Sequence, residues 1–389
     1  EAVALSRAQT RSIVSPHDQS VTFVELFFDL VFVYSVTQVV GHLHHHLDWV
    51  GVGQSVLVFW LVWWAWTQFT WALNAADTTH VSVEIVTLLA TGVAFFMAVA
   101  LPGAFTAGPL LFAIPYVVVR AIGLGLYARV AWEASESQHA SVRSFALMSV
   151  GGLAAVIGGA VAGGTTQYWL WGIAILLDVI AAFAVGGTDG WDLHPEHFAE
   201  RHGLFVIIAL GESLIVAAAG LTQAEFSVTV LLVGALAVGT TCALWWTYFA
   251  CAKPTLDEEL ERRTGAELSQ LARDAYTLLH FPLALGVIAF ASAIEGIVAH
   301  PSEPLDLANR FALGVGVVLF TGTMSVALWR ATGKLHALRL GLSLATCVAI
   351  VAVGGVVPIF TLSIAFAGSL LIGVLEHRKY GGHESVPTL

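Results

Sequence analysis

The sequence has little charge, few cysteines and none of the common catalytic motifs, and each shortage excludes a class of protein. Only 11% of the 389 residues are charged, against about 25% in a soluble globular chain. The three cysteines form no Cys-x-x-Cys or Cys/His pattern, so we expect neither disulfides nor a cysteine-ligated metal. The sequence also lacks a basic patch suited to nucleic acid and the GxSxG, HExxH, P-loop and dinucleotide-binding motifs. We therefore expect no cofactor and no nucleic-acid partner.

Hydrophobic residues, in contrast, make up 57% of the chain, and the mean hydropathy is +0.81. Apolar runs separated by short polar breaks predict an all-α integral membrane protein with about twelve transmembrane helices. We place these helices near residues 21–46, 50–74, 81–101, 109–132, 142–162, 167–186, 198–220, 226–251, 271–299, 308–330, 335–353 and 356–376.

Short matches between the two halves of the chain predict an internal repeat. Phe-Val-Glu ending at Glu25 corresponds to Phe-Ala-Glu ending at Glu200, and a tryptophan-rich motif follows in the next helix of each half. Because each half has six crossings, the two copies would share one orientation and form parallel repeats. The predicted organisation is an N-terminal segment 1–20, a first repeat 21–187, a linker 188–197, a second repeat 198–376 and a tail 377–389.

The distribution of lysine and arginine predicts the orientation in the membrane. The side shared by both termini holds Arg7, Arg11, Arg129, Arg143, Arg201, Lys253, Arg262, Arg263, Arg273, Arg330, Lys334, Arg339, Arg378 and Lys379. The opposite side holds Arg310, and Arg120 lies within a helix. The positive-inside rule then predicts that the N-terminal segment, the linker and the tail are all cytoplasmic.

Three segments resemble a known bacterial family. The first predicted helix contains the run ELFFDLVFV at 25–33, and two more segments, 197–214 and 274–291, match in order. Together they are similar to the low temperature requirement protein A (LtrA) family, over most of the chain. The resemblance implies a multi-pass protein of the bacterial cytoplasmic (inner) membrane but no reaction. The first helix also has a weaker likeness to the endolysosomal potassium/proton channels with an FSD motif, although Phe28 replaces the motif's serine.

The first predicted helix carries two carboxylates one turn apart, Glu25 and Asp29. A charge at the centre of a membrane helix costs about 2.5–3.5 kcal/mol to insert, so we expect both side chains to face the protein interior. The alternative is a pair near the membrane surface that is merely solvated.

Arg120 is the most informative single residue, because it lies about 16 Å along its helix from Pro109 and so near the middle of the membrane. Asp178 and Glu212 reach similar depths on other helices. We therefore expect an ion pair between Arg120 and Asp178 or Glu212, either as a structural link between helices or as part of a functional site.

Two further residues are candidates for an ion or proton pathway. Glu200, with Glu25 and Asp29, could line an acidic vestibule or could simply cap a helix N-terminus. His280 is expected to be buried, as a hydrogen-bonded core residue or as a proton carrier.

The histidine-rich run at 41–50 raises the question of a metal site. His42, His45 and His46 share one helix face, and Asp48 is close in sequence. A zinc site needs three or four converging ligands with supporting partners, whereas consecutive histidines at a helix end are often only solvated. We expect no metal there.

The buried carboxylates favour a transporter or channel for protons, small cations or a cation-coupled small solute. In this account Glu25, Asp29 and Glu212 bind or relay the cation, and Arg120 sets the electric field and controls gating through its carboxylate partners. A membrane-embedded enzyme acting on a lipid or isoprenoid is the main alternative, with Asp29, Glu212 and His280 as acid or base. A structural or sensory membrane protein is the third. The expected partners are the lipid bilayer and a small cation, proton or small molecule, and a homodimer is an open alternative to a monomer.

Overall fold

The computed structural model describes residues 12–16, 19–185, 191, 193–223 and 227–380. Apart from one β-bridge between Val14 and Ala76, the regular structure of these residues is helical. Arg7 and Arg11, part of the predicted linker 188–197 and residues 381–389 of the predicted tail lie outside the described residues, as does the side chain of Lys379.

The helices follow the predicted order. They are α1 (Phe23–His45), α2 (Trp49–Ala75), α3 (Val81–Ala100), α4 (Pro109–Ala134), α5 (Glu136–Ala162), α6 (Gly164–Val185), α7 (Pro195–Gln223), α8 (Val228–Trp246), α9 (Lys253–Glu261), α10 (Gly265–Leu271), α11 (His280–Ala299), α12 (Leu307–Thr332), α13 (Ala337–Ala352) and α14 (Pro358–Tyr380), with a short 3-10 turn η2 (Leu101–Gly103). Within the described residues, 11 helical stretches are long and apolar enough to cross a membrane, and Ala337–Ala352 is a shorter apolar helix. The prediction of an all-α membrane protein is confirmed.

Local sequence explains where several helices begin and end. Ser135, Ser227 and Asp306 each precede a helix and accept a backbone N–H of its first turn, at 3.2, 3.2 and 2.8 Å. Such caps satisfy N–H groups that have no partner inside the helix. Gly333 ends α12 with a φ of 72°, a left-handed conformation that glycine adopts without steric cost.

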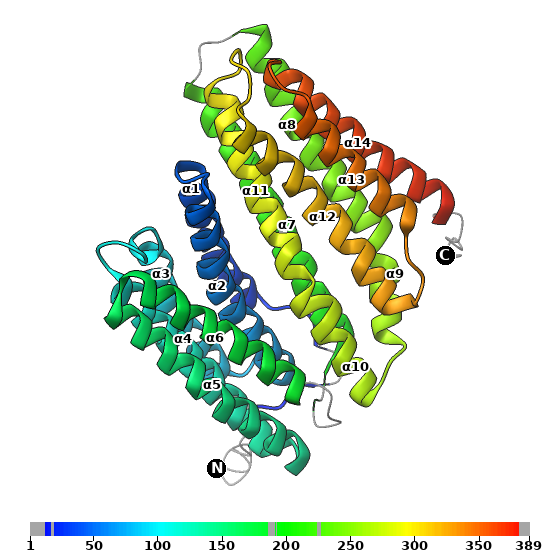
Figure 1. Cartoon of the computed structure of the whole chain (residues 1–389). Helices are drawn as coiled ribbons and strands as arrows, with labels where there is room; N and C mark the ends of the chain where they lie inside the picture. The colour runs from blue at the N-terminus through cyan, green and yellow to red at the C-terminus, as the bar shows by residue number, and fades with distance from the viewer. Residues whose placement is uncertain (1–11, 17–18, 186–190, 192, 224–226, 381–389) are drawn as a thin grey trace, which may run out of the picture. The chain divides into compact units, whose positions relative to one another are not determined.

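The chain divides into two compact units. Unit 1 comprises Glu1–Tyr34, Trp60–Arg201 and Thr264–Gln270, and unit 2 comprises Ser35–Phe59, His202–Arg263 and Leu271–Leu389. Within unit 1, α3, α4 and α5 each pack against the next helix in sequence (Figure 1). Within unit 2, α11 packs on α12, α12 on α13, and α14 on α8 (Figure 1).

Glycines allow a close contact between the backbones of α11 and α12 in unit 2. A side chain at Gly286 of α11 would come within 2.7 Å of the Phe320 backbone nitrogen, and one at Gly316 of α12 within 2.7 Å of the Phe290 nitrogen. The two backbones can approach this closely only because both positions lack a Cβ. The result is an α11 whose surface is buried on nearly every side.

Two π-helical segments interrupt the regular helices of unit 2. One is η3 (Thr247–Ala252), which joins α8 to α9, and the other is η4 (Ala272–Leu278), which precedes α11. The sequence did not predict them, because a locally wider helix leaves the hydrophobic pattern almost unchanged. Such segments often mark functional positions in helical proteins.

Candidate functional site

The two carboxylates of α1 are both fully buried, as predicted, with Glu25 and Asp29 each 0% exposed. Thr22, just before the helix, donates its backbone N–H and its hydroxyl to Glu25 Oε2, both at 2.9 Å. A glutamate in the first turn that reaches back to the residue before the helix is the usual capping arrangement. This contact holds one oxygen of Glu25 and leaves the other facing the interior.

Two residues of α7 meet these carboxylates, and they are also spaced one turn apart. The Nε2 atom of His197 lies 3.1 Å from Glu25 Oε1, and Arg201 donates from Nη2 to Asp29 Oδ1. The Nη1 atom of Arg201 lies 3.5 Å from Glu25 Oε1. We call Glu25, Asp29, His197 and Arg201 the α1–α7 cluster, and all of it lies in unit 1.

Sequence reasoning missed both α7 residues. Arg201 was grouped with the cytoplasmic charges, but its side chain is 0% exposed. An arginine near a helix end looks the same in sequence whether water or a carboxylate surrounds it. The available signal was the matching spacing: a Glu-x-x-x-Asp pair on one helix and a His-x-x-x-Arg pair on another can align face to face.

Helix α2 supplies the cluster's neutral partners. Trp66 donates its indole N–H to Asp29 Oδ1 at 2.7 Å, and its ring centroid lies 5.8 Å from the Arg201 guanidinium carbon. A guanidinium over an indole face adds a cation–π contact to the ion pair. Asn74 and Trp66 are both 0% exposed, and neither was predicted as a site residue.

Asn74 determines which nitrogen of His197 carries the proton. Its Oδ1 accepts the backbone N–H of His194 at 2.8 Å, and its Nδ2 donates to the His194 carbonyl at 2.9 Å, so the amide has one orientation. The same Nδ2 lies 3.1 Å from His197 Nδ1, which must therefore accept. Neutral His197 then carries its proton on Nε2 and donates it to Glu25.

The charges of the cluster do not balance. Two carboxylates face one guanidinium, and the Nδ1 atom of His197 is occupied by the hydrogen bond from Asn74. Asp29 Oδ2, Arg201 Nε and Arg201 Nη1 are buried and have no hydrogen-bond partner among the described residues. A buried site with surplus negative charge and an unpartnered carboxylate oxygen favours the uptake of a proton or a small cation.

The predicted ion pair of Arg120 is confirmed, with Asp178 as the partner. Arg120 Nη2 lies 3.2 Å from Asp178 Oδ1 and Nη1 lies 3.4 Å from Oδ2, so the pairing is bidentate. The remaining donors reach the Tyr116 hydroxyl at 2.7 Å, the Ser149 hydroxyl at 3.3 Å and the Gln68 side-chain oxygen. One guanidinium thus connects α2, α4, α5 and α6 of unit 1.

The other predicted pathway residues lie in different surroundings. Glu212 lies in unit 2, where it hydrogen-bonds Thr37 and is near enough to Glu295 for their charges to interact. Glu200 is exposed on α7. His280 is fully buried, accepts the Tyr248 hydroxyl at 2.8 Å and donates from Nδ1 to the Ala275 carbonyl at 2.9 Å, which matches the hydrogen-bonded core histidine.

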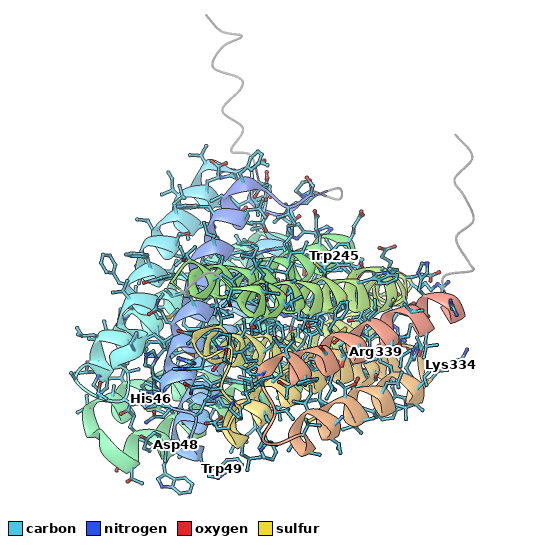
Figure 2. All side chains as sticks on the ribbon, turned by 90° about the horizontal axis from the view of Figure 1, so that it is seen from above. His46, Asp48, Trp49, Trp245, Lys334 and Arg339 are labelled. Atoms are coloured by element: carbon cyan, nitrogen blue, oxygen red, sulfur yellow. The ribbon has the colours of Figure 1, made fainter. Side chains whose placement is uncertain are left out.

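The histidines at the end of α1 direct ring nitrogens to other protein groups, and His44 Nδ1 lies 3.3 Å from the Ser292 carbonyl oxygen. His45 and His46 each donate Nδ1–H to the carbonyl four residues earlier, at 2.7 and 3.0 Å, and His42 Nε2 lies 3.1 Å from Gln54 Oε1. Asp48 accepts the N–H groups of the first turn of α2 (Figure 2). Among the described residues, no group of three or more His, Cys, Asp or Glu could hold a metal ion.

Comparisons with known proteins identify the family of this chain. The family model described as bacterial low temperature requirement A protein (LtrA) matches residues 20–375. A protein of Rhizobium meliloti (strain 1021), described as uncharacterized, is 30% identical over 324 residues, which cover 78% of this chain and 76% of that protein. No solved structure matches the chain. The chain therefore belongs to the bacterial LtrA family of membrane proteins, and the α1–α7 cluster lies within the matched region.

Proposed function

We propose that this protein is a transporter or channel that moves protons or a small monovalent cation, and that the α1–α7 cluster binds this cation. The observation that carries the proposal is the charge count: two fully buried carboxylates, Glu25 and Asp29, share the single guanidinium of Arg201. A surplus buried charge is costly in a membrane protein. One bound monovalent cation neutralises the cluster.

A proton is the cation that fits this cluster most simply. His197 cannot accept it without breaking the hydrogen bond that its Nδ1 receives from Asn74. The carboxyl groups are therefore the proton acceptors. Two of their oxygens, Glu25 Oε1 and Asp29 Oδ2, have no hydrogen-bond partner among the described residues, and Glu25 Oε1 lies 3.1 Å from His197 Nε2 and 3.5 Å from Arg201 Nη1. Arg201 and Trp66 hold Asp29 Oδ1, which leaves Oδ2 to gain and lose the proton.

The proposal also places the protein in the bacterial cytoplasmic membrane, with both termini in the cytoplasm. Membership of a bacterial family supports the cytoplasmic membrane, and exposed basic residues at the predicted cytoplasmic helix ends, such as Arg129, Arg143, Arg262 and Arg378, support cytoplasmic termini. Cysteine labelling of intact cells at the two chain ends checks the orientation, because an impermeant reagent reaches only the outer face.

Flux measurements test the transport activity. Purified protein in liposomes, with the membrane potential clamped, should carry protons down a pH gradient. If the cation is sodium or potassium, the protein should carry that ion down its concentration gradient. Asp29→Asn should abolish this flux, since an amide cannot take up a proton or neutralise a cation. Glu303→Gln is the matched control, because the Glu303 side chain is 75% exposed and lies on a loop of unit 2.

Two outcomes would contradict the proposal. The first is a parent protein with no flux under any of the three gradients. The second is an Asp29→Asn variant that melts within a few degrees of the parent and carries the same flux, which would place the cation elsewhere.

A further inference from the structure

A pocket of about 130 Å³ lies in unit 2 where α13 begins and α14 ends. Its lining residues are Leu335, His336, Ala337, Leu338, Arg339, Leu375 and Glu376. The proposed transport activity uses none of these residues, and only Arg339 contributes to the sequence patterns, as one of the basic residues that predict the orientation. The pocket combines a buried ion pair with exposed apolar side chains.

The polar end of the pocket is a buried carboxylate with one oxygen to spare. Glu376 is 5% exposed, and its Oε2 accepts Arg339 Nη1 at 2.6 Å. The second oxygen, Oε1, is buried without a hydrogen-bond partner in the described part of the chain, and His336 Nδ1 lies 3.7 Å from it. Oε1 can therefore accept a hydrogen bond from a ligand.

The Arg339 guanidinium makes its hydrogen bonds to protein oxygens. Its Nε donates to the Thr321 carbonyl at 2.8 Å, and its Nη2 donates to the carbonyl of Thr247, in the π-helical segment η3, at 3.0 Å. The guanidinium is thus held in place by α12, η3 and α14. It fixes one carboxylate oxygen and leaves the other facing the pocket.

The start of α13 provides a complementary positive end. The first N–H groups of a helix have no partner within it, and the helix dipole favours an anion there. His336, the residue that precedes α13, gives no side-chain cap to these groups. Lys334 is exposed on the loop that precedes α13, and it lies at the same end of this helix as Arg339 (Figure 2). A phosphate is the anion that such a helix start commonly binds.

The pocket also has an apolar border. Leu335 and Leu338 line it and are 53% and 50% exposed. His377 and Arg378, which follow Glu376, are exposed and charged or polar, as expected where a membrane helix leaves the hydrocarbon. A ligand here would place its polar group in the pocket and its apolar part along the two leucines.

We propose that this pocket binds the headgroup of phosphatidylethanolamine. Its primary ammonium donates a hydrogen bond to Glu376 Oε1, its phosphate lies against the first N–H groups of α13 beside Lys334, and its acyl chains follow Leu335 and Leu338. Phosphatidylcholine fits poorly because its trimethylammonium has no N–H to donate. Phosphatidylglycerol has no cation to pair with Glu376.

Delipidated protein in detergent provides the test, with Tm followed as each lipid is added. Phosphatidylethanolamine should raise Tm by a few degrees, because a ligand that binds only the folded state stabilises it. Phosphatidylcholine and phosphatidylglycerol should raise it clearly less. Soluble phosphoethanolamine should have a weaker effect than the lipid, since it lacks the acyl chains.

Variants separate the site from general lipid effects. Leu338→Trp fills the pocket without changing the Glu376–Arg339 pair and should remove the response to phosphatidylethanolamine. Leu344→Trp is the control, because Leu344 is 49% exposed on the same helix but does not line the pocket. Glu376→Gln should also remove the response if the variant folds.

The proposal is overturned if the three lipids raise Tm equally, or if Leu338→Trp responds like the parent. A response to soluble phosphoethanolamine without one to the lipid would also overturn it. None of these outcomes bears on ion flux, so the transport proposal is tested separately.

Discussion

Arg120 and Arg201 are both buried in unit 1, but their surroundings differ in charge and in hydrogen bonding. Arg120 faces one carboxylate, Asp178, in a bidentate pair, and neutral oxygen atoms take its remaining donors. Arg201 faces two carboxylates, and its Nε and Nη1 have no hydrogen-bond partner among the described residues. The first site is balanced in charge and in hydrogen bonds, and the second is balanced in neither.

This difference separates a structural link from a site that can change its charge. A balanced buried pair has nothing to gain from a further ion, and removing either member leaves an uncompensated charge. A cluster with surplus negative charge instead gains from one added cation. The comparison assigns Arg120 to the assembly of α2, α4, α5 and α6, and Arg201 to the proposed cation site. Three variants test this assignment, and their expected effects decrease from Arg120 through Asn74 to Glu200.

Breaking the balanced pair should cost the most stability. We expect Arg120→Met to lower the free energy of unfolding by about 3–5 kcal/mol, because Asp178 is left buried and charged. The double variant Arg120→Met/Asp178→Leu should recover much of this loss, since it removes both charges. Denaturation in detergent measures both values. A single variant as stable as the parent would show that this pair does not hold the helices.

Removing the amide of Asn74 should have a smaller effect on stability and a specific effect on flux. Asn74→Leu leaves the backbone of His194 and the ring of His197 without their partner, at a cost of about 1–3 kcal/mol. It also frees His197 Nδ1 to take up a proton, so the pH dependence of flux should change while maximal flux remains.

Thr70→Val is the matched control for Asn74→Leu. Thr70 is buried on the same helix, and its hydroxyl donates to the Trp66 carbonyl of that helix at 3.1 Å. Because this bond lies within α2, the pH profile of the variant should follow the parent's. If both variants shift the profile equally, Asn74 does not act through His197.

The smallest effect is expected at Glu200, which precedes Arg201 in sequence but is exposed. Glu200→Gln should change the free energy of unfolding by no more than about 0.5 kcal/mol, as is usual for an exposed side chain. Flux should stay close to that of the parent. A strong loss of flux would instead favour the acidic vestibule that the sequence suggested as one role for this residue.

Some features of the sites could be predicted because they depend on position along a single helix. The depth of Arg120 and Asp178 follows from the rise per residue, and burial of Glu25 and Asp29 follows from the cost of exposing charge to lipid. The partners of these carboxylates could not be predicted in the same way. Which side chains meet the carboxylates depends on how α2 and α7 are rotated about their axes. The largely apolar sequences of these helices do not specify that rotation.

The proposed division into two parallel six-helix repeats stays a prediction. It rests on short sequence matches, such as those that end at Glu25 and Glu200. A superposition of residues 21–187 on 198–376 in an experimental structure would check it. An inverted relation between the halves would contradict it.

The sequence by itself determined the class of protein, the approximate helix boundaries and the membership of a bacterial membrane family, because hydropathy, caps and motifs are local properties. Only the tertiary structure decided that Arg201 and His197 meet the carboxylates of α1, that Asn74 sets the histidine tautomer, and that one oxygen of Glu376 has no hydrogen-bond partner in the described chain. The physical reason is that an ion pair is a relation between distant segments. Its strength depends on burial and geometry that no single helix specifies.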